Sequence, residues 1–211
     1  MRGYVYDMDE YVGKNITRYL KDTGAKRKLK EVATPFLDES REPMGCTVVE
    51  ATGDERSQEI PLPSRLPKPT VNSQEATDVK PPQQFNKIAA GISMQSMYAA
   101  RMARHDTLRA VGNLATYLTK WGRAEDEKLH RFVSYLNSTK DLKQVGVGGD
   151  APGKLRLALY ADSDLAGDRR DCKITSGIFL CLVGPHTIFP LTSISKKQTS
   201  TSHSSPEAEL V

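Results

Sequence analysis

The chain has 211 residues, 38% of them hydrophobic, and a net charge of +4, which allows one or two domains and suits a nucleic-acid partner without indicating one. Its three cysteines, Cys46, Cys172 and Cys181, show neither a disulfide framework nor a zinc-ligand spacing, so we expect a reducing compartment. No signal peptide or membrane-spanning run is present in the sequence, which predicts a cytoplasmic or nuclear location and no membrane partner.

The first predicted element is a short amphipathic helix from Val12 to Leu20, which Gly24 can end. A basic run, 26–30, follows it. Such a run is usually a solvated face and less often a phosphate contact. Pro35 then prevents any helix from continuing.

Residues 38–84 change the composition of the chain. Prolines are spread here among Ser, Glu, Thr and Lys, with few large apolar side chains. Little apolar surface is available to offset the entropy of ordering, so we expect a flexible, disordered insert.

Apolar residues recur at helical spacing in three segments after the insert, 88–102, 108–118 and 129–136. These stripes predict a helical core more than a partner groove. Asp106 is placed to cap the second helix. The polar faces carry cations that can meet a phosphate backbone, namely Arg101, Arg104, Arg109, Lys120, Lys128 and Arg131.

The period changes to two beyond the glycines at 146, 148 and 149, which we interpret as a hinge rather than a phosphate-binding loop. Residues 155–160 alternate and predict a half-buried strand. Two more strands are expected at 174–183 and 187–194, with a turn at Gly184-Pro185 between them.

Two carboxylates stand at informative places in this last region. Asp162 follows the first strand, and Glu209 lies in the first turn of a helix that Ser204 or Ser205 can cap. Acids brought together from a strand end and a helix start can hold Mg²⁺, which prefers oxygen ligands. Each residue also has a plainer interpretation, Asp162 as a turn residue and Glu209 as an acid favoured by the helix dipole.

Several motifs in this order resemble the Pol polyprotein of copia-type LTR retrotransposons, at the end of reverse transcriptase and the start of ribonuclease H. The stretch Ala161 to Asp168 is similar to the family's Asp-x-Asp-Trp-Ala-Gly motif. The elements Thr175-Ser176-Gly177, Ser195 to Gln198 and Ser204 to Glu209 are similar to its later motifs. Upstream, 97–106 and 131–139 resemble the helical region before ribonuclease H, and 11–36 resembles the segment that closes the polymerase.

The resemblance implies a mixed fold of the α+β or α/β class. It divides the chain into the end of a reverse transcriptase at 1–37, the insert at 38–84, a helical connection region at 85–145 and the N-terminal half of a ribonuclease H-like domain at 154–211. The last region would hold the first three strands and the start of the first helix of a mixed sheet.

The resemblance also implies the chemistry, which is hydrolysis of RNA in an RNA–DNA hybrid at two Mg²⁺ ions roughly 4 Å apart. Asp162 and Glu209 match catalytic, metal-holding acids, and Asp164 is an auxiliary metal ligand. Lys196, Lys197, Arg101 and Arg104 are the expected nucleic-acid contacts, although Lys196 and Lys197 serve equally well to blunt an edge strand. The implied partners are the hybrid and the rest of the Pol polyprotein.

The sequence also departs from the family. The later aspartates of ribonuclease H have no counterpart before Val211, Leu165 replaces the family's tryptophan, and the paired aspartates of the polymerase are missing. We therefore expect an inactive fragment when this chain is isolated. The alternative hypothesis is a non-enzymatic, basic relic that only binds nucleic acid, and a purely structural helical protein is the third.

Overall fold

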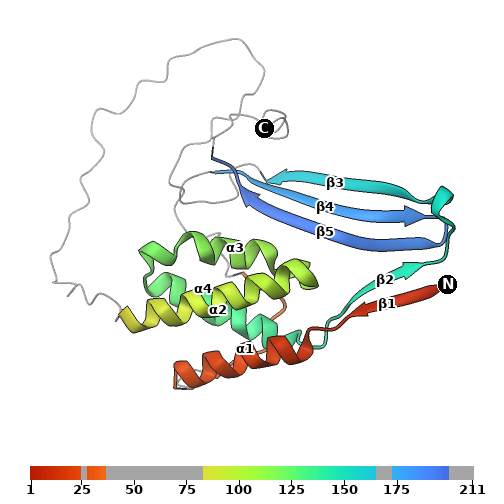
Figure 1. Ribbon diagram of the computed structural model, residues 1–211. Coiled ribbons are helices and arrows are strands. Elements are labelled where there is room, and N and C mark those ends of the chain that lie inside the picture. The colour runs from red at the N-terminus through yellow and green to blue at the C-terminus, as the bar shows by residue number, and fades with distance from the viewer. Residues whose placement is uncertain (25–27, 37–82, 165–172, 200–211) are drawn as a thin grey trace, which may run out of the picture.

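The computed structural model describes residues 1–24, 28–36, 83–164 and 173–199 (Figure 1). Of residues 83–87 only the backbone is described. Nearly all of the expected insert lies outside the described residues, and so do the expected helix at Ser204 and the candidate ligand Glu209.

The helices predicted from the apolar periods are confirmed. They are α1 (Asp9–Asp22), α2 (Gln83–Met102), α3 (Leu108–Thr116) and α4 (Arg123–Ser138). Gly24 follows α1 with a φ of 65°, a backbone conformation that glycine adopts readily, so its role at the end of the helix is also confirmed. The predicted cap of α3 is wrong: Thr107 holds the N-cap position, its hydroxyl donates to the backbone oxygen of Arg104 and does not cap the helix, and Asp106 is engaged elsewhere.

The helices bury one shared apolar core. Val12 and Ile16 of α1 pack there with Ile92 of α2, Leu129 and Phe132 of α4. In addition, the Asn15 side-chain amide donates a 2.6 Å hydrogen bond to the hydroxyl of Ser96, which joins α1 to α2. Segments on either side of the insert in sequence therefore lie side by side in space.

A five-stranded sheet stands beside the helices, with every neighbouring pair antiparallel. Its strands are β1 (Arg2–Tyr6), β2 (Gln144–Gly148), β3 (Arg156–Asp164), β4 (Thr175–Gly184) and β5 (Thr187–Lys197), in the order β1-β2-β5-β4-β3. The predicted combination of helices with a sheet, the predicted strands β3 to β5 and the turn after Gly184 are confirmed.

The interpretation of the glycine-rich segment as a hinge is wrong, because Gly146 and Gly148 lie within β2. A Cβ on Gly146 would stand 2.6 Å from Cδ2 of Phe189, so the ring of Phe189 occupies the space that a side chain would need. Tyr4 and Tyr6 of β1 meet the same ring edge-on. Glycine here allows close packing within a strand and does not mark its end.

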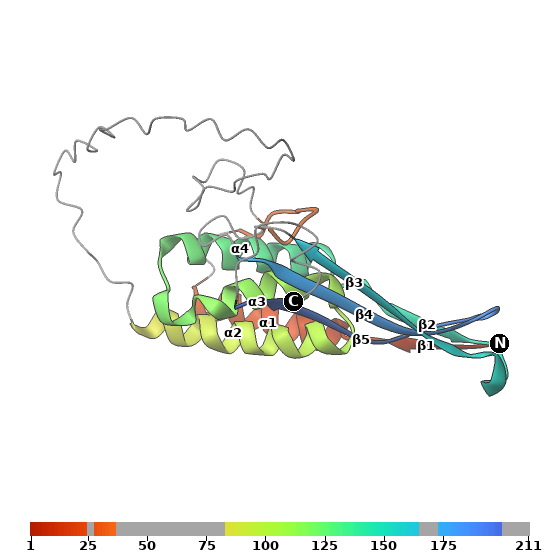
Figure 2. The ribbon, with the colours of Figure 1, turned by 90° about the horizontal axis from the view of Figure 1, so that it is seen from above.

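The expected half-burial of β3 is also wrong. Leu157 and Leu159 are 66% and 64% exposed. Figure 2 shows the reason: the sheet meets the helices at one end and extends away from them toward β1 and β2. On the other face the exposure varies along the sheet, since Cys181 is 2% exposed and Tyr160 is 60% exposed.

Candidate functional site

Three motifs that are far apart in the sequence meet at one end of the sheet. Asp162 of β3 pairs with Gly177 of β4, which pairs with Ser195 of β5. One step further along, Asp164 pairs with Thr175, which pairs with Lys197. Side chains directly opposite one another share a face of the sheet, so these two rows lie on the same face.

The carboxylate of Asp162 is exposed. Its Oδ1 accepts a 2.9 Å hydrogen bond from the backbone N–H of Ser163, which fixes the side chain near its own strand. Its neighbour across the ladder is Gly177, which has no side chain to cover it. The arrangement leaves oxygen atoms of Asp162 accessible to a ligand.

Asp164 lies two residues further along, on the face that meets the helices. Its Oδ2 forms an ion pair of 2.5 Å with Nη2 of Arg109 in α3, and both side chains are about half exposed. The same guanidinium lies 5.6 Å from the centre of the Phe36 ring. A cation bound by Asp164 would compete with Arg109, so this carboxylate suits an auxiliary role better than a primary one. Sequence reasoning placed Arg109 only among general surface cations and gave no signal for this pairing.

The donor chemistry of this sheet end fits Mg²⁺ only in part. Asp162 and Asp164 offer carboxylate oxygens on one face, which are ligands that Mg²⁺ prefers. Within the described ranges, however, the structure gathers no group of three or more His, Cys, Asp or Glu side chains suited to hold a metal ion. The third expected ligand, Glu209, lies outside those ranges.

The expected nucleic-acid contacts fall on different surfaces. Lys197 shares the face of Asp164, whereas Lys196 pairs with Ser176 and therefore projects from the opposite face. Lys196 is exposed and Lys197 is half-buried. Arg101, near the end of α2, is exposed as expected.

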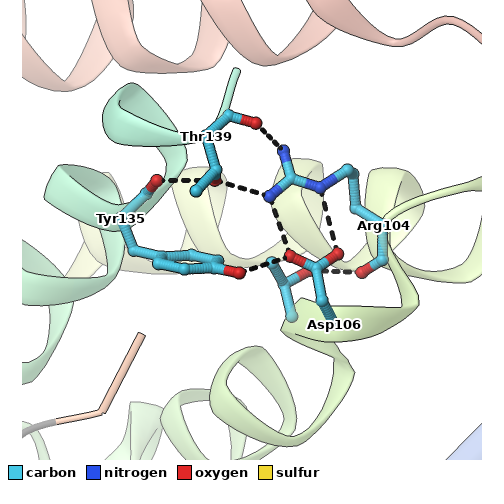
Figure 3. A network of polar contacts seen from close by, with 5 residues as sticks. Arg104, Asp106, Tyr135 and Thr139 are labelled. Carbon is cyan, nitrogen blue, oxygen red and sulfur yellow. Dashed lines mark hydrogen bonds and ion pairs between the residues drawn. The ribbon is translucent and has the colours of Figure 1, made fainter. Parts of the chain in front are cut away.

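The prediction that Arg104 lies on an exposed polar face is wrong, because the residue is only 2% exposed. Its Nε and Nη2 donate to the two carboxylate oxygens of Asp106 at 3.0 and 2.8 Å (Figure 3). Its Nη1 and Nη2 also donate to the backbone oxygen and the hydroxyl of Thr139, at 3.0 and 2.7 Å. The Tyr135 hydroxyl donates to Asp106 over 2.9 Å. Arg104 thus joins the end of α2 to the end of α4 and is not placed to meet a phosphate.

The electrostatics of this network follow from its geometry. Partial burial acts to raise the pKa of Asp106, but the hydrogen bonds and charge of Arg104, aided by Tyr135, outweigh it and hold that pKa below its ordinary value. Burial and the neighbouring Asp106 carboxylate raise the pKa of Tyr135. Asp106 is therefore ionised and Tyr135 neutral at pH 7, which is the charge pattern that the hydrogen bonds require.

Comparison with protein-family models, with curated proteins and with solved structures gives no match to this chain. Among the described helices, none combines the length and the apolar character that crossing a membrane requires.

Proposed function

We propose that the chain is a region of a copia-type retrotransposon Pol polyprotein, spanning the end of reverse transcriptase and the first part of ribonuclease H. Its ancestral role is metal-dependent hydrolysis of the RNA strand of RNA–DNA hybrids during reverse transcription. The observation that carries the proposal is the register of β3, β4 and β5. It aligns Asp162, Gly177 and Ser195, one residue from each of three motifs that resemble that family.

The arrangement of these strands supports the same proposal. β3, β4 and β5 form a continuous antiparallel meander, and β3 is the edge strand of the described sheet. A ribonuclease H-like sheet starts with three strands of this kind, and its first strand carries the first catalytic aspartate. In this proposal Asp162 takes that position.

Asp162 and Glu209 are the residues that would hold Mg²⁺, with Asp164 as the auxiliary acid. When bound, Mg²⁺ would supply an activated water and stabilise the leaving oxygen of the phosphodiester. Lys196, Lys197 and Arg101 are proposed to contact the hybrid's backbone. Because the family's later aspartates have no counterpart in this sequence, we expect the 211-residue chain to bind hybrid without cutting it.

The test is to sequence the transcript past the codon for Val211 and to express any longer product beside the present chain. With Mg²⁺ the longer product should cut the RNA of a labelled hybrid. Asp162→Asn should abolish cleavage and leave thermal unfolding unchanged, whereas Asp141→Asn, an exposed aspartate after α4, should cut normally. Cleavage that survives Asp162→Asn would refute the role of this residue, and a longer product that never cuts would refute the enzymatic proposal.

A second candidate is a binding module without catalysis. It is favoured by the ion pair of Asp164 with Arg109, which already satisfies one of the expected metal ligands. This alternative predicts hybrid binding that weakens with salt, is indifferent to Mg²⁺ and is never followed by cleavage.

A further inference from the structure

A basic groove lies between α4 and the segment that follows α1. It has a volume of about 450 Å³, and its charged lining consists of Lys28, Lys30, Arg131 and Glu127, with His130 beside them. The lining thus carries three permanent cations against one anion. It shares no residue with the sheet end that holds Asp162 and Asp164.

Local packing directs the two lysines toward the groove. Leu29 stands between them and packs against the helical core, whereas Lys28 and Lys30 are both exposed. With the middle residue turned inward, its neighbours on either side are presented outward together. The ammonium groups of Lys28 and Lys30 therefore lie along one wall of the groove.

The opposite wall is held in place by hydrogen bonds. Arg131 donates from Nε to the backbone oxygen of Thr34 and from Nη2 to its hydroxyl, each at 3.0 Å. His130 Nδ1 is hydrogen-bonded to the Tyr19 hydroxyl at 2.9 Å. Because a guanidinium has five N–H donors, these two bonds position Arg131 and leave donors for an anion.

The chemistry of the lining selects the ligand class. A line of cations in a concave surface suits a chain of regularly spaced anions better than an isolated one. No Phe, Tyr or Trp lines the groove among the described residues, so base stacking contributes nothing there. A membrane surface would need exposed apolar side chains to insert, yet Val32, the apolar lining residue, is half-buried.

We propose that this groove binds the phosphodiester backbone of nucleic acid, without regard to sequence. The inference deepens the proposed function, on which it rests for the identity of the partner. It adds a contact surface remote in sequence from the catalytic candidates. Lys28 and Lys30 each neutralise a phosphate, and Arg131 orients a third.

The test compares binding of a fluorescent RNA–DNA hybrid to the full chain and to two charge-matched double variants. Lys28→Glu/Lys30→Glu changes the groove, and Lys140→Glu/Lys154→Glu makes the same charge change at exposed lysines outside it. The groove variant should bind at least about tenfold more weakly, with the slope of log affinity against log salt smaller by about two. The control should retain most of the affinity and the slope. Circular dichroism confirms that both variants keep the helical content of the parent chain.

Equal loss in both variants would overturn the groove, because net charge alone would then explain binding. Displacement of the hybrid by polyglutamate as readily as by unlabelled hybrid would overturn the assignment to a phosphate backbone. If the parent binds and the groove variant binds equally well, the groove is refuted while the proposed partner stands. If the groove variant alone is weakened but a longer product never cuts hybrid, the groove stands and the enzymatic proposal fails.

Discussion

Arg104 and Asp106 stand two residues apart between α2 and α3, yet their partners Tyr135 and Thr139 come from the end of α4. The buried guanidinium is balanced by a carboxylate that is 35% exposed on its side chain. A buried charge that loses its counterion is costly, so these residues act as one unit and stability depends on keeping the pair intact.

Replacing Asp106 should therefore destabilise the helical layer. We expect Asp106→Ala to lower the free energy of unfolding by about 2 to 3 kcal/mol, since it leaves the buried Arg104 without its carboxylate and with hydrogen bonds to Thr139 alone among the described residues. Glu10→Gln breaks an ion pair with Lys14 between largely exposed side chains, and it should leave the free energy of unfolding nearly unchanged. Urea unfolding followed by circular dichroism measures both, and equal effects in the two variants would contradict the coupling.

The Arg104–Asp106 pair also makes the stability of the folded chain depend on pH. The pKa of Asp106 is lower in the folded chain than its ordinary value of 3.8, so the stabilisation from its ionised form is complete above that value. It is lost as the pH falls through the folded pKa. We expect the stability difference between the parent chain and Asp106→Asn to be constant from neutral pH down to about pH 4 and to shrink below it. A difference that stayed constant through the acid range would show that Asp106 is not the titrating group.

Single residues were predictable from the sequence only where their environment is local. Gly24 ends α1 through its own backbone conformation, which depends on nothing remote. Arg104 sits at a helix end among polar residues, and its burial depends on Tyr135 and Thr139, which lie about thirty positions later. No local pattern contains that information.

Among the elements, the helices were the most predictable. Each helix buries one apolar stripe, and the apolar residues of such a stripe recur every three to four positions in the sequence. β1 and β2 were not predicted, because the contacts that stabilise them come from residues that are remote in the sequence. β2 is glycine-rich, and the packing that stabilises it comes from Phe189, more than forty residues later. The sequence therefore predicted the meander β3 to β5 but not the two strands that extend it.

Gly146 provides a test of this packing. We expect Gly146→Ala to lower the free energy of unfolding by about 2 kcal/mol, because the added Cβ would stand 2.6 Å from the Phe189 ring. Gly148→Ala, in the same strand with nothing within 4 Å of the added Cβ, should be neutral or slightly stabilising. The double variant Gly146→Ala/Phe189→Ala should show a favourable coupling in a double-mutant cycle. Additive losses would mean that the ring and Gly146 do not compete for the same space.

At the scale of the whole molecule, the helical layer encloses an apolar core, whereas the sheet leaves one apolar face uncovered within the described residues. Leu157, Leu159 and Ile194 are 49% to 66% exposed on the sheet face turned away from the helices, and within the described residues β3 has no strand on its outer side. Alternation in the sequence predicted that these leucines would be covered. The alternation of apolar residues does not indicate what covers the face that they form, because the pattern is the same whether the partner of that face is present or absent.

An open apolar face next to an edge strand favours association between copies of the chain. We expect sedimentation velocity to show self-association that rises with concentration, and Leu157→Lys/Leu159→Lys to shift the chain toward monomer. The helical layer does not contain these residues, so its thermal unfolding should be unchanged. Met94→Lys/Met102→Lys, at two apolar α2 side chains that are 50% and 46% exposed, makes the same charge change elsewhere and should leave association as it is. If the control dissociates the chain as well as the leucine variant does, exposed hydrophobicity in general drives association. A parent chain that is monomeric at every concentration would contradict the prediction.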